Sequence, residues 1–163
     1  MEQANDEQTA GVEMEAALQQ ALALIGAHVV ESTRPAAQRL DVVVEAGDLP
    51  AVVQALIDAR WGYLASITGL DLGVEAGIIE AIYHFCAGGD VLALRVRLAR
   101  DDAEVPTICG VIPSASFYER ELSEMLGVTV RGTPDSRPLF LPEEWPEGVY
   151  PLRKDFDPED IRR

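Results

Sequence analysis

The residues that could carry chemistry in this chain are few and widely spaced. The 163-residue sequence has two histidines, His28 and His84, and two cysteines, Cys86 and Cys109. A metal site needs several ligands at defined spacing, and an iron–sulfur cluster usually takes four thiolates, so neither set suffices. We expect the cysteines to be small buried apolar residues and the histidines to be structural or surface groups.

Three carboxylates, Glu119, Glu121 and Glu124, crowd one predicted helix. Glu121 and Glu124 are three residues apart and can lie side by side, as an acid/base pair would. We favour a solvated or ion-paired helix face, in which Glu124 pairs with Arg120. No P-loop, dinucleotide-binding glycine motif or nucleophile elbow is present. A free-standing small acidic enzyme using Glu121, Glu124 or His84 is therefore kept only as a remote alternative.

Apolar periodicity predicts the elements that would position these residues. The expected order is a helix, a strand, a helix, three strands and a helix. Helices are predicted over residues 14–25, after Asp48 as a capping residue, and after Pro113; strands are predicted over Leu40–Glu45, Gly62–Leu70, Ile78–Cys86 and Val91–Ala99. This order favours an α+β fold with helices packed on one face of a mainly antiparallel sheet.

The clearest local signal is a β-hairpin around Gly88 and Gly89, whose freedom at positive φ suits a tight turn. Apolar residues occupy every second position of the strand Val91–Ala99, which predicts one packed and one solvated face. For the last helix, Ser116 and Glu119 have capping-box spacing and Gly127 stands where the helix should end.

The composition changes after residue 127. Six of the ten prolines lie in residues 128–163, together with many aliphatic and aromatic residues. Proline excludes a long helix or a central strand, and exposed apolar groups need a surface to cover them. The sequence predicts a disordered acidic tail over residues 1–11, a globular α+β domain over 12–127, and an extended arm over 128–163 that wraps partner subunits.

Charge and composition disfavour nucleic acid as a partner and a direct span of the membrane. The net charge of −15 disfavours a nucleic-acid partner, because the chain repels phosphate backbones. No apolar run approaches the roughly 20 residues of a spanning helix, so we expect no direct membrane span. The polar, acidic start is unlike a secretory signal, and two distant cysteines fit a reduced, cytoplasmic chain.

Residues Arg153-Lys154-Asp155 form the one dense charged group of the predicted arm. One interpretation is a solvated turn. The other is an interface anchor in which Arg153 binds a partner carboxylate through its two-pronged guanidinium. Composition alone leaves both open.

Four stretches of the second half form a recognisable series. They are Ser114–Glu121 (SASFYERE), Glu124–Val128 (EMLGV), Gly132–Arg137 (GTPDSR) and Pro151–Phe156 (PLRKDF). This series resembles the family of C-type subunits of NADH-quinone oxidoreductase (respiratory complex I), whose pattern reads approximately E-R-E, D-M-F-G-I, G-H-P-D-L-R and P-L-R-K-D-F. The earlier half agrees only in element order and in a Tyr-His pair.

The resemblance implies a non-catalytic scaffold subunit of the peripheral arm of the complex, on the cytoplasmic side of the membrane. It implies no cofactor in this chain, with iron–sulfur clusters and a flavin or nickel–iron centre in its partners. Those partners would be a hydrogenase-large-subunit-like protein, the D-type component of complex I, and a small-subunit-like iron–sulfur protein. The partner interface would comprise Glu119, Arg120, Glu121, Pro134, Asp135, Arg137, Trp145, Pro151, Leu152, Arg153, Lys154, Asp155 and Phe156.

The sequence departs from the family pattern at several positions. Glu124 stands where Asp is usual, Leu126 where Phe is usual, and Thr133 in place of His. Energy-converting membrane-bound nickel–iron hydrogenases carry a related subunit in the same structural place. The departures leave open which of the two complexes this chain serves.

Overall fold

The structure is a computed structural model that describes residues 16–162. The predicted tail, residues 1–11, lies outside the described residues. A helix is described over residues 16–25 and is followed by a 3-10 turn, η1 (Gly26–His28). Leu18 and Ile25 of this helix are buried, as the helical spacing of its apolar residues predicts.

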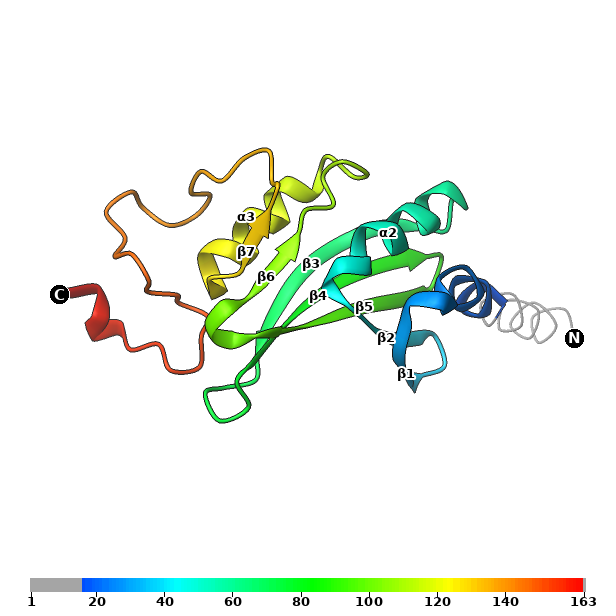
Figure 1. Cartoon of the computed structure of the whole chain (residues 1–163), viewed down its shortest axis with the longest axis horizontal. Helices are drawn as coiled ribbons and strands as arrows, with labels where there is room; N and C mark the ends of the chain where they lie inside the picture. Colours follow the sequence, from blue (N-terminus) through cyan, green and yellow to red (C-terminus); the bar gives the residue numbers. More distant parts are fainter. Residues whose placement is uncertain (1–15, 163) are drawn as a thin grey trace, which may run out of the picture.

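Five strands form the main sheet, in the order β1-β2-β5-β4-β3 (Figure 1). They are β1 (Val29–Ala36), β2 (Arg39–Val44), β3 (Tyr63–Asp71), β4 (Ile78–Ala87) and β5 (Asp90–Ala99). Neighbouring strands are antiparallel except β2 and β5, which are parallel. The predicted α+β class with a mainly antiparallel sheet is confirmed. Strand β1 was not predicted, because its residues are almost all exposed and show no apolar alternation.

Two α-helices follow within the domain, α2 (Leu49–Asp58) and α3 (Ala115–Leu126). A separate two-stranded parallel pair joins β6 (Glu104–Pro106) to β7 (Thr129–Arg131) and so brackets α3. Three further 3-10 turns are η2 (Ala46–Asp48), η3 (Arg100–Asp102) and η4 (Pro158–Arg162). The β6–β7 pair was not predicted, because three-residue strands carry too little periodicity to be detected.

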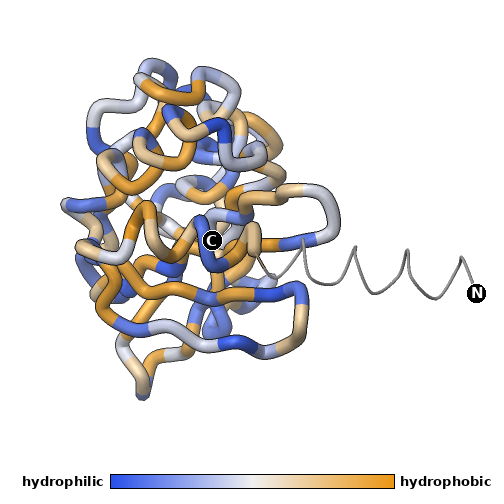
Figure 2. Tube along the Cα trace, turned by 90° about the vertical axis from the view of Figure 1, so that its right-hand side faces the viewer, coloured by the Kyte–Doolittle hydropathy of each residue, from blue (hydrophilic) through white to orange (hydrophobic). Residues whose placement is uncertain are grey.

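The core lies on one face of the sheet, under the helices. Phe85 faces Leu92 and Tyr83 faces Leu94 across the β4–β5 pair, and all four are fully buried. On the opposite face Arg95 bonds to Glu80 and Asp41, so charged side chains of that face are paired with one another. The predicted alternation is confirmed, and hydrophobic and hydrophilic residues alternate over short distances along the trace (Figure 2).

Two local predictions need correction. In the β4–β5 hairpin only Gly88 has a positive φ, +60°, so the turn uses one of the two glycines rather than both. Asp48 stands at the N-cap of α2 but makes no capping hydrogen bond with its side chain. Its carboxylate lies 3.1 Å from Nδ1 of His28 instead, which joins the η1 turn to the start of α2.

After β7 the chain runs through turns and irregular structure from residue 132 to residue 157, which we call the C-terminal segment. No residue from 131 to 159 is buried. The segment lies back along α3 toward the end of the domain where β3 and β4 are joined (Figure 1). The predicted extended arm is therefore not confirmed in this form. No helix among residues 16–162 is both long and apolar enough to cross a membrane.

Candidate partner interface

Helix α3 carries most of the first two motif stretches, Ser114–Glu121 and Glu124–Val128. Gly127 ends it with φ +71°, a left-handed conformation that glycine adopts without strain, as predicted. The apolar face of α3 packs on β3 so closely that a Cβ on Gly69 would lie 2.1 Å from Leu126 and 2.7 Å from Leu122. This contact fixes which side of α3 remains available for the C-terminal segment.

Glu119 faces the interior and is 1% exposed. Its carboxylate accepts hydrogen bonds from the backbone N–H of Ile108 at 2.8 Å and from the hydroxyl of Thr107 at 2.7 Å, and Sγ of Cys109 lies 3.2 Å away. Burial raises the pKa of the Cys109 thiol to about 11, which is typical of a structural cysteine. The predicted capping box with Ser116 is wrong, because Glu119 binds the loop before the helix rather than the helix end. A buried carboxylate offers no atom to a partner, so we leave Glu119 out of the proposed interface.

Arg120 and Glu124 bind the backbone of the C-terminal segment. Arg120 donates to the carbonyls of Arg137 and Pro138 at 2.7 and 2.6 Å. The carboxylate of Glu124 accepts from the backbone N–H groups of Leu139 and of Phe140, the latter at 3.0 Å. The predicted pairing of Arg120 with Glu124 is wrong, since these two side chains bind neighbouring parts of the segment rather than each other.

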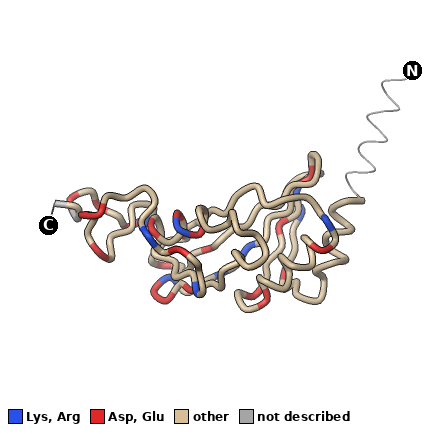
Figure 3. Tube along the Cα trace, turned by 90° about the horizontal axis from the view of Figure 1, so that it is seen from above, with Lys and Arg blue, Asp and Glu red and all other residues tan. Residues whose placement is uncertain are grey.

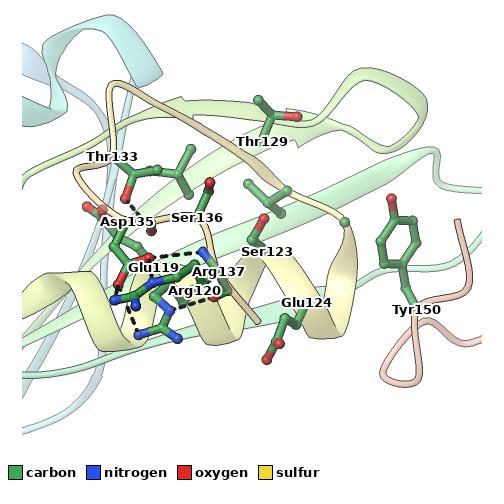
Figure 4. A pocket seen from close by; sticks show the side chains of 13 residues that line it. Glu119, Arg120, Ser123, Glu124, Thr129, Thr133, Asp135, Ser136, Arg137 and Tyr150 are labelled. Carbon is green, nitrogen blue, oxygen red and sulfur yellow. Dashed lines mark hydrogen bonds and ion pairs between the residues drawn. The ribbon is translucent and has the colours of Figure 1, made fainter. Parts of the chain in front are cut away.

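Asp135 and Arg137 form an ion pair within the first turn of the segment. The two carboxylate oxygens of Asp135 accept from Nε and Nη2 of Arg137 at 2.9 and 2.7 Å, and Arg120 approaches the same carboxylate at 3.5 Å. The Arg137 guanidinium holds the pKa of Asp135 well below its ordinary value. Figure 4 shows this cluster at one side of a groove of about 310 Å³, opposite Tyr150. Pro134 and Arg137 are exposed.

The second attachment of the segment is to the C-terminal end of α3. Leu152 N–H donates to the carbonyl of Met125 at 3.0 Å, and Nε of Arg153 donates to the carbonyl of Leu126 at 2.8 Å. The last carbonyls of a helix lack intrahelical partners and carry partial negative charge, which a guanidinium satisfies. Arg153 also lies over the ring of Tyr150, 4.6 Å from its centre. Arg153 is thus bound within its own chain.

A third attachment joins the segment to the sheet. Asp71 at the end of β3 accepts from the backbone N–H of Lys154 at 2.9 Å, and buried Arg100 binds both Asp71 and Asp155. Neither Asp71 nor Arg100 was predicted as a functional residue. The sequence offers one signal for them, which is that each residue directly follows a predicted apolar strand. A charged residue at that position is by default expected to be solvated, so the signal does not indicate a buried pair.

The middle of the segment packs mainly on itself. Indole Nε1 of Trp145 donates to the carbonyl of Val149 at 2.8 Å, and the Trp145 ring stacks on Phe156 with centroids 6.4 Å apart. Both rings and Pro151 are half-buried. These contacts fold the chain around Trp145 back toward Phe156.

The side chains that these attachments leave outward are apolar or charged. Phe140 is 63% exposed and Leu152 is 59% exposed, while Lys154 and Asp155 are exposed as well. Glu121 is half-buried on α3. Asp and Glu recur along the trace near the C-terminal end (Figure 3). Exposed aromatic and aliphatic side chains of this kind can contribute to a surface that docks on another protein where they lie together.

The structure does not gather the residues of the enzyme alternative into one site. Glu124 lines the groove, whereas Glu121 and His84 do not. His84 lies on the open face of the sheet, where its Nδ1 is 3.2 Å from the hydroxyl of Ser66 and burial lowers its pKa. Among the described residues no group of His, Cys, Asp and Glu is arranged to hold a metal ion.

Comparisons with known proteins agree with the motif series. Residues 42–162 match the family of the respiratory-chain NADH dehydrogenase 30 Kd subunit. The chain is 36% identical to the C-type subunit of NADH-quinone oxidoreductase from Chlorobium phaeobacteroides, over 60% of this chain and 58% of the relative. It is 39% identical to membrane-bound hydrogenase subunit beta of Pyrococcus furiosus, over 52% and 50% of the two chains. It is 30% identical to the C/D-type subunit of NADH-quinone oxidoreductase from Bacteroides thetaiotaomicron, over 75% of this chain and 25% of the relative.

A solved structure supports the same assignment. A chain of an archaeal membrane-bound sulfane sulfur reductase, a respiratory membrane complex, superposes with a TM-score of 0.73 at 26% identity, over 88% of this chain and 85% of that one. The chain spans between 21% and 62% of the length of the curated relatives it matches. The family match extends over most of the chain and contains all four motif stretches. The chain therefore belongs to the family of the respiratory-chain NADH dehydrogenase 30 Kd subunit.

Proposed function

We propose that this chain is a non-catalytic structural subunit of a membrane-bound NADH-quinone oxidoreductase, in the part of the complex that lies outside the membrane. One observation carries the proposal. Arg120, Glu124 and Arg153 order a segment within the chain, while that segment turns Phe140 and Leu152 outward. A chain whose charged motif arranges an apolar surface is suited to holding other subunits in register.

The partner we propose is a hydrogenase-large-subunit-like protein of the D type. The relative from Bacteroides thetaiotaomicron carries the combined designation C/D, and this chain matches only 25% of its length. Joining two regions in one chain keeps them close together, and separate chains of the same kind need an interface to do so. We propose that Pro134, Arg137, Leu152, Lys154 and neighbouring exposed residues of the C-terminal segment form that interface, alongside an iron–sulfur subunit and on the cytoplasmic side of the membrane.

Affinity purification tests this proposal. The full chain would be tagged in its own host, membranes would be extracted in mild detergent, and the co-purifying chains would be identified. We expect a large-subunit-like protein and an iron–sulfur protein to be retained. Recovery of the tagged chain alone, as a stable monomer, would overturn the proposal.

The second candidate is the equivalent subunit of an energy-converting nickel–iron hydrogenase, which is favoured by the similarity to the beta subunit of a membrane-bound hydrogenase. The two complexes differ in the cofactors of their other subunits. Flavin together with quinone-dependent NADH oxidation in the purified complex would support the first candidate. Nickel in the complex, without flavin, would support the second.

A further inference from the structure

Asp71 is the point at which the C-terminal segment joins the sheet. Its Oδ1 accepts from the backbone N–H of Gly73 at 2.9 Å and from Nε of Arg100 at 3.0 Å. Its Oδ2 accepts from Nη2 of Arg100 at 3.1 Å and from the backbone N–H of Lys154 at 2.9 Å. Asp71 is 2% exposed, so the carboxylate is buried and each of its oxygens accepts two hydrogen bonds. One of these four donors belongs to a residue 83 positions later in the chain.

Arg100 completes the same unit from the end of β5. It is 5% exposed, and its guanidinium also binds the carboxylate of Asp155. Its backbone carbonyl lies 3.3 Å from Nη2 of Arg153. Two carboxylates thus surround one buried cation, and both the backbone and the side chains of residues 153–155 take part.

We propose that Arg153-Lys154-Asp155 is an intramolecular latch that closes on Asp71 and Arg100 in the free chain, and that it positions Leu152 for the partner. This role adds a third interpretation to the solvated turn and the direct partner anchor, because the triplet is hydrogen-bonded within its own chain. Its consequence for binding rests on the proposed function, whereas the latch itself is a property of the free chain. Ordering the segment before association lowers the entropy lost on binding.

The two carboxylates that bind Arg100 differ in exposure, so their contributions can be separated by mutation. The side chain of Asp155 is 51% exposed, whereas that of Asp71 is 1% exposed. Changing Asp155 to Asn leaves the buried Arg100–Asp71 pair intact and weakens only the contact to the segment. Changing Asp71 would strand a buried guanidinium and destabilise the whole domain. Asp155→Asn is therefore the informative variant.

Hydrogen exchange of the full free chain tests the latch directly. In Asp155→Asn we expect the amides of Leu152 and Lys154 to exchange roughly threefold to tenfold faster, with the amides of β4 and β5 unchanged. Glu75→Gln is the matched control, because Glu75 is an exposed carboxylate in the neighbouring β3–β4 loop and the change removes the same charge. Equal protection of residues 150–155 in wild type and Asp155→Asn would overturn the latch.

Binding kinetics to the purified large-subunit-like partner separate positioning from direct contact. If Asp155 positions Leu152, only molecules with a closed latch bind the partner. Asp155→Asn then lowers the association rate by the fraction of molecules in which the latch has opened, and it leaves the dissociation rate unchanged. A faster dissociation rate with unchanged exchange in the free chain would show that Asp155 touches the partner, and the latch would be rejected. Absence of any binding by the wild-type chain would reject the proposed function while the exchange data still decide the latch.

Discussion

The sheet domain and the C-terminal segment are stabilised by different kinds of contact. Strands β4 and β5 bury Phe85, Leu92 and Leu94 completely, and every second side chain along them faces the core. In contrast, residues 131–159 contain no buried side chain, and the attachments of the segment to α3 consist largely of hydrogen bonds to backbone groups. The domain buries a large apolar core, although it also exposes Val30, Tyr63, Val74 and Phe117. The segment leaves Phe140 and Leu152 largely exposed, while its other aromatic side chains are half-buried within the chain.

The largest expected effect comes from the core. Phe85→Ala should lower the free energy of unfolding by about 3–5 kcal/mol, because a fully buried ring is removed and a cavity is left. Phe140→Ala should change it by less than about 0.5 kcal/mol, because that ring is 63% exposed. Denaturant unfolding of both variants measures the difference. Similar losses from the two variants would contradict the division of roles between domain and segment.

The buried Asp71 should make stability depend on pH. Arg100 and two backbone N–H groups lower the pKa of Asp71 below its ordinary value, and the charged form is therefore favoured by folding. Its contribution is complete above the unfolded pKa of about 3.9 and is lost as the pH falls toward the folded pKa. Asp71→Asn should cost about 3 kcal/mol at pH 7.

The sign of this effect is tested by unfolding wild type and Asp71→Asn between pH 7 and pH 3. The gap in unfolding free energy between the two proteins should shrink below about pH 4. A gap that stays constant over this range would mean that the Asp71 carboxylate is not stabilised in its charged form.

Gly127 joins the two regions at the end of α3. A Cβ there would lie 2.4 Å from the ring of Tyr150, and the backbone has φ +71°. Gly127→Ala should therefore cost about 1–2 kcal/mol and displace Tyr150 and Arg153 from the helix end. Hydrogen exchange should rise at residues 150–153 and stay unchanged in β5. Gly26→Ala is the control, because nothing lies within 4 Å of a Cβ at that glycine.

A smaller loss of stability than at Gly127 is expected at the first attachment, between Glu124 and the C-terminal segment. Glu124→Ala removes the acceptor for the N–H groups of Leu139 and Phe140, and should cost roughly 1 kcal/mol. Proteolysis should become faster within residues 137–141, while Glu121→Ala, the same change three residues earlier on α3, should leave it unaltered. Unchanged cleavage in Glu124→Ala would show that Glu124 does not hold the segment.

These regions also differ in how far the sequence predicts them. Apolar periodicity predicts the β4–β5 hairpin and the helices, because packing against one core imposes a repeat that is visible locally. Strand β1 and the β6–β7 pair are missed, because one is exposed and the others are three residues long. Neither leaves an apolar repeat.

The sequence predicts which residues belong to the candidate site, but not which groups they bind. The motif stretches identify Arg120 and Arg153 as important, but their targets are backbone carbonyls of Arg137, Pro138 and Leu126, which carry no sequence signal. The link from Asp71 to Lys154 spans 83 residues and becomes visible only in the fold. The contacts that Arg153 makes within its own chain could therefore not be predicted, and its expected role as a partner contact stays a prediction.

The most direct test of the docking surface is hydrogen exchange of the assembled complex against the free chain. We predict that association protects residues 137–156, most strongly around Phe140 and Leu152, and leaves the open sheet face around Arg95 and Arg97 unchanged. Protection confined to that sheet face, with exchange of the C-terminal segment unaltered, would contradict the claim that the segment is the docking surface.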